Sequence, residues 1–179
     1  MFVGIPGSGK TTFARQLASE LQAVVLNSDS IRIGMWKNRQ AIEATHANPA
    51  ERKHANQLTF GAMNYATGQI IAAGHSVVYD CNANHHYERD EKHDIATKYD
   101  AISLVVRIKV PYEVSLDRVQ NREESHDQRR MSPEKAKAVL DRFVREIEEP
   151  DDSERVIEIS GEVSFEQQLQ QFKLKLSQF

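Results

Sequence analysis

Eight residues near the start of the chain constrain its fold and chemistry more than any other stretch. Residues 4–11 read Gly-Ile-Pro-Gly-Ser-Gly-Lys-Thr and fit G-x-x-x-x-G-K-[ST] at every fixed position. Small residues let the backbone wrap so that several N–H groups point at one anion. The pattern therefore predicts a phosphate-binding loop in which Lys10 is a catalytic cation and the Thr11 hydroxyl binds Mg²⁺. The residues expected to contact the nucleotide are Gly4, Pro6, Gly7, Ser8, Gly9, Lys10, Thr11 and Thr12.

The residues that flank this loop support the same interpretation. After it, apolar residues from Phe13 to Leu21 recur at helical spacing. The loop should therefore open onto a helix N-terminus, whose dipole favours the same anion. Only three residues precede Gly4, whereas a strand that delivers such a loop usually has about five. Either the first strand is unusually short or the gene product begins upstream of residue 1.

Length and composition set the broad class of protein. The 179 residues are most simply one domain, 1–179, of ordinary globular composition. The net charge of −3 argues against a globally basic nucleic-acid binder, although not against a local basic channel. The single cysteine, Cys81, permits no internal disulfide and suits the cytoplasm, where we expect this protein. No apolar run approaches the length of a membrane span, so no membrane partner is expected.

Strand and helix patterns alternate along the chain. This order predicts an α/β, doubly wound fold with a five-stranded parallel sheet. The strands are expected at residues 1–3, 23–26, 75–80, 102–110 and 156–159. The helices are expected at about 13–21, 30–36, 40–45, 50–73, 88–99, 112–122, 133–147 and 165–179.

Two helices have apolar stripes whose buried faces can be predicted. In the long helix 50–73, the apolar face should consist of Ala55, Leu58, Ala62, Tyr65 and Ala66. In the helix that begins at Pro133, the stripe should belong to the core rather than to a cofactor-binding surface. Its residues are Ala136, Val139, Leu140, Phe143, Val144 and Ile147.

Acidic residues follow two of the predicted strands, where open parallel sheets collect their functional groups. Asp29 and Arg32 come after the strand 23–26, and Asp29 is either a functional group or a cap of the next helix. Asp80 ends the strand 75–80. It is a candidate for supporting Mg²⁺, for orienting an acceptor group, or for capping a turn.

Two polar segments are candidates for enclosing a substrate. The first is the polar segment 37–53, which we call the excursion. Its basic residues either line an acceptor pocket or form a solvated face. Arg118 and Arg122 lie four apart on one helix face, before a charge-dense segment. They suit a mobile lid at about 122–132 over phosphate groups, or else a solvated helix end. The basic residues of the excursion are Lys37, Arg39, Arg52 and Lys53.

Two other features suggest chemistry that their sequence neighbours do not support. His85 and His86 do not belong to a cysteine or carboxylate pattern with the tight spacing of a zinc site, so we expect surface histidines rather than a metal site. Cys81 has no lysine or arginine nearby in the sequence, so we expect a packed thiol rather than a nucleophile.

With these residues in view, the chain resembles the small P-loop kinases. More narrowly, it is similar to the AAA-type ATP-binding group that contains phage polynucleotide 5′-hydroxyl kinase and the zeta toxins. The resemblance rests on the loop 4–11, the segments 27–32 and 77–84, and the helix with Arg118 and Arg122, which occur in the right order. It implies a three-layer P-loop NTPase fold that uses ATP and Mg²⁺.

The resemblance also implies roles on the acceptor side of the site. Asp29 matches the catalytic residue that serves as general base toward the acceptor hydroxyl. Arg32 matches an arginine that holds an acceptor phosphate. Asp80 and Asn82 lie in a D-x-N motif beside the acceptor pocket.

On the donor side, the resemblance implies two arginines. Arg118 matches a residue that stacks on adenine, and Arg122 a catalytic lid arginine on the β- and γ-phosphates. The turn at 160–162 would lie near the edge of the adenine.

Two classes of function follow. The favoured one is an ATP-dependent kinase that transfers the γ-phosphoryl group to an acceptor hydroxyl. That acceptor is a polynucleotide 5′-hydroxyl or a small molecule such as a nucleoside, sugar or nucleotide-sugar. The alternative is an ATP-hydrolysing switch or toxin-type protein without a dedicated acceptor, which would not need the pair Asp29 and Arg32. The sequence leaves open the acceptor, the oligomeric state and the choice between ATP and GTP.

Overall fold

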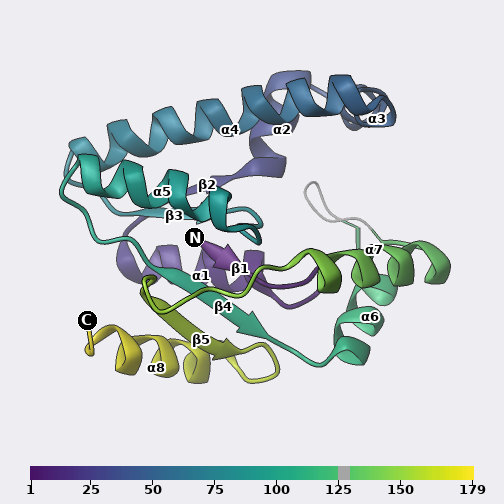
Figure 1. The fold of residues 1–179 in the computed structure, drawn as a ribbon. Helices are drawn as coiled ribbons and strands as arrows, with labels where there is room; N and C mark the ends of the chain where they lie inside the picture. The colour runs from purple at the N-terminus through teal and green to yellow at the C-terminus, as the bar shows by residue number, and fades with distance from the viewer. Residues whose placement is uncertain (125–129) are drawn as a thin grey trace.

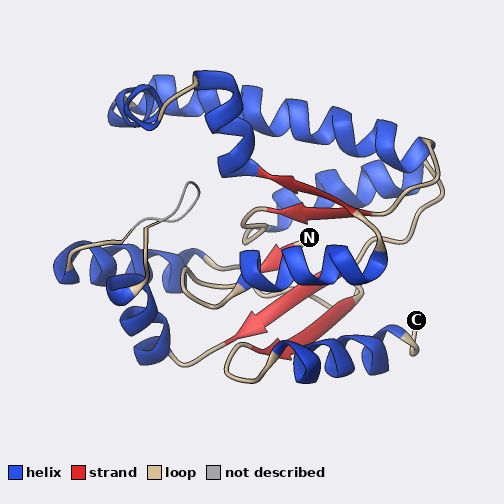
Figure 2. Cartoon of the chain, turned by 180° about the vertical axis from the view of Figure 1, so that it is seen from behind, coloured by secondary structure: helices blue, strands red, loops and turns tan. Residues whose placement is uncertain are grey.

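A layer of short parallel strands runs through the middle of the molecule, with helices on both sides (Figures 1 and 2). The computed structural model describes residues 1–124 and 130–179. Each described strand lies where the sequence predicts one, since short β-branched runs are typical of buried parallel strands. The strands are β1 (Phe2–Val3), β2 (Val24–Asn27), β3 (Val77–Asp80), β4 (Val105–Lys109) and β5 (Val156–Ser160).

The strands do not form one five-stranded sheet, and this part of the sequence prediction is wrong. β4 pairs with β1 and β5 in one parallel sheet, while β2 pairs with β3 in a second. The physical reason is that β1 has only two residues, too few to form ladders on both of its edges. Within the described residues, the two sheets meet at a single bridge between Phe2 and Asn82. There the N–H of Ala83 donates to the carbonyl oxygen of Phe2 over 2.9 Å.

In the described residues, eight helices connect and cover the strands, and each corresponds to a helical pattern in the sequence. Asn48 accepts hydrogen bonds from the N–H groups of Ala50 and Glu51, and Pro49 follows it, so α4 begins directly after α3. None of these helices is long and apolar enough to cross a membrane. The helices are α1 (Lys10–Leu21), α2 (Ser28–Trp36), α3 (Arg39–Ala47), α4 (Pro49–Ala72), α5 (His86–Lys98), α6 (Tyr112–Asn121), α7 (Pro133–Glu146) and α8 (Phe165–Leu176).

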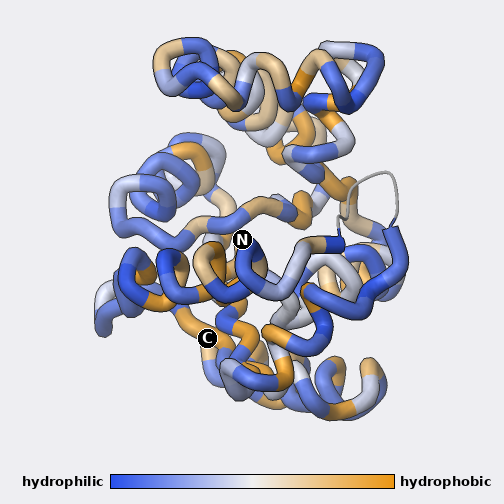
Figure 3. Tube along the Cα trace, turned by 90° about the vertical axis from the view of Figure 1, so that its right-hand side faces the viewer, coloured by the Kyte–Doolittle hydropathy of each residue, from blue (hydrophilic) through white to orange (hydrophobic). Residues whose placement is uncertain are grey.

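The strands separate two apolar clusters, because successive residues of a strand point to opposite faces. Val78 of β3 packs with Phe13 of α1, whereas the next residue, Tyr79, packs with Met63 of α4. Phe172 brings α8 onto the same face as α1, with its ring centroid 6.3 Å from that of Phe13. In Figure 3 the helices accordingly show hydrophobic and hydrophilic residues in alternation around their turns.

The buried face of α4 is not the one that the sequence predicts. Leu58 and Tyr65 are 46% and 72% exposed, and the buried residues lie at neighbouring positions. The helix can bury a threonine because the Thr59 hydroxyl donates to the carbonyl oxygen of Ala55 over 2.8 Å. A polar residue therefore occupies the inner face, and hydrophobicity alone predicts the wrong buried face of the helix. The buried residues of α4 are Ala55, Thr59, Met63, Thr67 and Gly68.

α6 and α7 pack against each other beside the strand layer (Figure 1). Val119 of α6 forms a small apolar core with Ala136 and Leu140 of α7, and all three side chains are fully buried. The predicted stripe of α7 is therefore core only in part, since Val144 is 53% exposed.

We expect Leu140→Ala to destabilise the protein by about 2–5 kcal/mol, because it leaves a cavity between α6 and α7. Val144→Ala, on the same helix, is the matched control and should cost less than about 0.5 kcal/mol. Urea denaturation followed by circular dichroism measures both changes. Equal midpoints for the two variants would contradict the packing described for this helix pair.

Candidate active site

The loop 4–11 connects β1 to α1, and glycines allow two close approaches around it. Gly7 has a φ of 84°, and a Cβ there would lie 2.6 Å from the carbonyl oxygen of Ser115 on α6. A Cβ on Gly161, in the turn after β5, would lie 2.5 Å from the carbonyl oxygen of Ser8. The loop is therefore held between α6 and the turn before α8, and it ends at the N-terminus of α1, where anions are favoured.

The ammonium group of Lys10 is bound to the loop. Its Nζ donates to the carbonyl oxygens of Gly4 and Ile5 over 2.7 and 2.8 Å. Burial lowers the pKa of Lys10 from 10.5 to about 8, although the nearby carboxylate of Asp80 opposes this shift. An anion in the loop would favour the charged form, so the lysine is suited to binding phosphate.

Asp80, at the end of β3, is buried directly behind the loop. Its Oδ1 accepts from the Thr11 hydroxyl over 3.3 Å, and its Oδ2 accepts from Nδ2 of Asn27 over 2.7 Å. Burial raises the pKa of Asp80, while these two hydrogen bonds and the charge of Lys10 oppose the rise. A carboxylate beside the loop hydroxyl offers the oxygen ligands that Mg²⁺ prefers, so the residues present fit that ion. This contact favours the interpretation in which Asp80 supports Mg²⁺.

A cleft of about 920 Å³ lies in front of the loop, with walls from α2 and α3 on one side and from α6 and α7 on the other. The turn after β5 also reaches it, through Gly161. Most of the site residues predicted from the sequence meet in this cleft. Those that line it are Pro6, Gly7, Gly9, Lys10, Thr11, Thr12, Asp29, Asn82, Arg118 and Arg122. The other predicted site residues are buried and do not line the cleft, and these are Gly4, Ser8, Arg32 and Asp80.

Asp29 reaches the cleft from the first turn of α2, with 57% of its side chain exposed. Asn27 caps this helix by accepting a backbone N–H over 2.8 Å, so Asp29 is not needed as a cap. The Oδ1 of Asp29 accepts from Nη1 of Arg32 over 3.2 Å. Arg32 is buried, donates through Nη2 to Asn56 over 3.1 Å, and lies over the ring of Phe60. α4 therefore fixes the arginine that holds Asp29.

The cleft has a wall on α7 that the sequence analysis missed, and a wall on α3 that it gave as one of two alternatives for the basic residues of segment 37–53. One face of α3 and one face of α7 point into it, so the prediction that the α7 stripe is core is wrong for Val139 and Phe143. Apolar periodicity marks a face that avoids water, but it does not distinguish packing from the lining of a pocket. A basic residue and a histidine at helical spacing in the excursion were the available signal on α3. The lining residues are Arg39, Ile42 and His46 on α3, and Val139, Arg142 and Phe143 on α7.

The remaining basic residues of the excursion lie elsewhere. Lys37, Arg52 and Lys53 are exposed and do not line the cleft, so they form a solvated surface. On the opposite wall, Arg118 and Arg122 both line the cleft, and Nη1 of Arg118 donates to the carbonyl oxygen of Gly7 over 3.4 Å. Residues 125–129 of the predicted lid 122–132 lie outside the described part of the chain.

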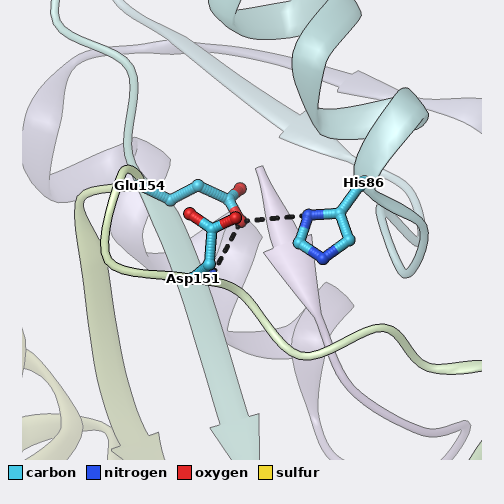
Figure 4. A group of neighbouring side chains, drawn as sticks. All are labelled: His86, Asp151 and Glu154. Carbon is cyan, nitrogen blue, oxygen red and sulfur yellow. Dashed lines mark hydrogen bonds and ion pairs between the residues drawn. The ribbon is translucent and has the colours of Figure 1, made fainter.

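A second group of polar side chains joins α5 to the segment before β5 (Figure 4). Ligand atoms of His86, Asp151 and Glu154 lie within 4.8 Å of one another, so His86 has carboxylate neighbours that come from a distant part of the sequence. A cation is already present, because the fully buried Arg89 donates through Nε to Glu154 over 2.7 Å. Its Nη2 lies 2.9 Å from Nδ1 of His86, which must accept because arginine only donates. We interpret the group as an ion-pair network that joins α5 to the segment before β5, rather than as a metal centre.

A family comparison agrees with this site. The family model described as an AAA domain matches residues 1–150 of the chain. Because this is well over half of its length, the chain belongs to that AAA domain family. No curated protein matches this sequence.

Solved structures show the same fold. A gluconokinase from Sinorhizobium meliloti 1021 has a TM-score of 0.67 at 16% identity, over 99% of this chain and 90% of that chain. Kti12 from Chaetomium thermophilum, in complex with ADP-AlF3, has a TM-score of 0.69 at 18% identity, over 98% and 96%. The APS kinase of Mycobacterium tuberculosis, in complex with AMPPNP and APS, has a TM-score of 0.63 at 17% identity, over 98% and 95%. The predicted resemblance to small AAA-type P-loop kinases is confirmed.

We expect Arg89→Ala to lower the free energy of unfolding by about 3–5 kcal/mol, because Glu154 would keep a buried charge without its partner. Arg145→Ala, on the exposed surface of α7, is the matched control and should change it by less than about 0.5 kcal/mol. Thermal and urea denaturation measure both. If Arg89→Ala is as stable as the control, the ion-pair network around Arg89 does not stabilise the position of α5.

Proposed function

We propose that this protein is an ATP- and Mg²⁺-dependent kinase that transfers the γ-phosphoryl group to a hydroxyl of a small molecule. The observation that carries the proposal is that Asp29 lines the same cleft as Lys10 and Thr11. A phosphate-binding loop alone suits many nucleotide-using proteins. A carboxylate across the cleft from it adds a group that can accept a proton from an alcohol.

In the donor half, the loop N–H groups and Lys10 bind the β- and γ-phosphates, and Arg118 packs against the adenine. Thr11 and Asp80 would hold Mg²⁺, which neutralises phosphate charge when it is bound. Arg122, at the end of α6, lines the cleft, and we assign it to neutralising charge on the transferring group. We assign Asp80 to this half rather than to the acceptor, because its contact is with Thr11.

In the acceptor half, Asp29 takes the hydroxyl proton as the alcohol oxygen bonds to the γ-phosphorus. The bond from that phosphorus to the β–γ bridging oxygen breaks, and ADP leaves with that oxygen. Arg32 is buried behind Asp29, so we assign it to orienting this carboxylate rather than to holding an acceptor phosphate. Asn82 lines the cleft and completes this half of the site.

The distribution of basic residues favours a small acceptor over a polynucleotide. A strand of nucleic acid needs a row of cations along its backbone. Within the described excursion, Arg39 lines the cleft, but Lys37, Arg52 and Lys53 do not. The gluconokinase and the APS kinase with this fold are, by name, kinases of small molecules.

We expect Asp29→Asn to lower kcat about 10²–10³-fold and to leave the Kd for ATP within about twofold, because it removes the base but no phosphate contact. Asp94→Asn, at an exposed position on α5, is the matched control and should keep full activity. ADP release with a panel of nucleosides, sugars, sugar acids and nucleotide-sugars measures turnover, and calorimetry measures ATP affinity. The panel includes 5′-hydroxyl oligonucleotides.

Three outcomes would count against the proposal. Full turnover by Asp29→Asn removes this residue as the base. Stimulation by oligonucleotides alone identifies a polynucleotide kinase. Slow ATP hydrolysis that no alcohol stimulates identifies a nucleotide switch. Lys10→Ala tests the donor half separately, because normal ATP binding by that variant contradicts the assignment of the loop.

We expect ATP affinity to fall as the pH rises past about 8, where the buried Lys10 loses its proton in the free protein. Bound phosphate favours the charged lysine, so binding takes up a proton above that pH, and the Kd should rise by up to about tenfold per pH unit. Calorimetry in buffers of different ionisation enthalpy measures this proton uptake. Lys10→Arg keeps its charge at these pH values, so its affinity should be nearly independent of pH. A wild-type Kd that is constant up to about pH 9.5 would contradict the lowered pKa.

A further inference from the structure

The walls of the cleft carry a strong excess of positive charge, although the chain as a whole has a net charge of −3. Among the described residues that line it, five are cationic and a single one, Asp29, is anionic. A concave surface of one sign raises the local concentration of ligands of the opposite sign. The cations are Lys10, Arg39, Arg118, Arg122 and Arg142.

The nucleotide accounts for only part of this charge. Lys10, Arg118 and Arg122 belong to the donor half of the proposed kinase site, and Mg²⁺ neutralises two further phosphate charges. The proposal assigns neither Arg39 on α3 nor Arg142 on α7 to that half, although both line the cleft. Two arginines of the cleft that contains Asp29 therefore have no role in the proposed donor half.

These two arginines belong to opposite walls and have apolar neighbours. On α3, Arg39 shares its face with Ile42, which is buried. On α7, the guanidinium of Arg142 lies over the ring of Phe143, with its carbon 5.2 Å from the ring centroid. Its Nε also pairs with Glu146 over 3.6 Å, so the side chain is held along the helix at the edge of the cleft. The two walls thus combine one cation each with apolar surface.

We propose, on the basis of the kinase function above, that the acceptor is a small alcohol that itself carries an anionic group, a phosphate or a carboxylate. Arg39 and Arg142 bind that group from the two walls, and Asp29 receives the hydroxyl proton. The apolar lining from Ile42 and Phe143 contacts the body of the molecule. Arg39 and Arg142 are thus specificity-determining residues, and neutral alcohols are poor substrates.

Sulfate serves as a probe of this anion site that does not depend on knowing the acceptor. The protein is first saturated with Mg²⁺ and a non-hydrolysable ATP analogue, so that the phosphate positions of the donor are filled. We expect sulfate to bind the loaded protein in the millimolar range. Arg39→Ala and Arg142→Ala should each weaken sulfate binding at least about tenfold, as for a lost charge-assisted hydrogen bond. Calorimetry or NMR titration measures this binding.

Exposed arginines outside the cleft provide matched controls. Arg52→Ala, on α4, is the control for Arg39→Ala, and Arg145→Ala, on α7, is the control for Arg142→Ala. Both controls should bind sulfate as the wild type does. All four variants should keep their affinity for the ATP analogue within about twofold, since the proposal assigns neither Arg39 nor Arg142 to the donor half.

A second measurement uses turnover with matched alcohols that differ only in charge. Gluconate and glucose 6-phosphate are compared with glucose, and nucleoside 3′-monophosphates with the free nucleosides. The proposal expects the charged member of a pair to stimulate ADP release at least about tenfold more strongly, by analogy with the arginine contacts above. Arg39→Ala should raise its KM with little change in kcat.

The outcomes separate this inference from the function on which it rests. If the wild type binds the ATP analogue but no sulfate, or if both variants bind sulfate normally, the anion site does not exist and the kinase proposal stands. A preference of the wild type for neutral alcohols over charged ones would also overturn the inference of an anion site. If the wild type does not bind the ATP analogue, the kinase proposal fails, and the inference fails with it.

Discussion

The hydrogen bonds of the buried Asp80 carboxylate are the interaction on which the candidate site depends. Because β1 has only two residues, backbone pairing between the two sheets is limited to one bridge within the described chain. Asp80, at the end of β3, links its own sheet to the phosphate loop, because one oxygen accepts from Thr11 at the start of α1. The other oxygen accepts from Asn27, its neighbour on β2 within the same sheet. The N–H of Gly4, which donates to Oδ1 of Asn84 over 3.1 Å, adds a second link. Polar side chains at and after the end of β3 thus hold the phosphate loop against the β2–β3 sheet.

The two halves of the cleft are built in different ways. The proposed donor half comes mainly from one continuous segment, residues 4–12, whose chemistry is local. The proposed acceptor half is assembled from α2 and α3, which follow each other in the chain, and from α7, which lies far from them in the sequence. α4 does not line the cleft but acts on it through Asn56, which binds the Arg32 that binds Asp29. The charge of the cleft is opposite to that of the whole chain because it collects arginines from several of these elements.

Much of the fold could be predicted because its signals are local. The positions of all described strands and helices follow from apolar runs, caps and the loop motif. The failures share one cause, which is that a side chain's environment depends on what packs against it. Thr59 is buried because its hydroxyl bonds within the helix, while Tyr65 is 72% exposed. Val139 and Phe143 line a pocket, although their spacing is that of a core stripe. Asn27 caps α2, and this leaves Asp29 to face the cleft.

The sequence by itself determined the phosphate loop, the order of strands and helices, and the position of Asp29 and Asp80 at strand ends, because these depend on residues close together in the chain. Only the tertiary structure decided that the strands form two sheets, that Asp80 contacts Thr11, and that Arg39 and Arg142 line one cleft. These are contacts between distant segments, and their formation depends on how helices pack on a sheet rather than on any local pattern. The loop 4–11 can therefore be predicted from its own residues, whereas the rest of the cleft forms only in the folded molecule.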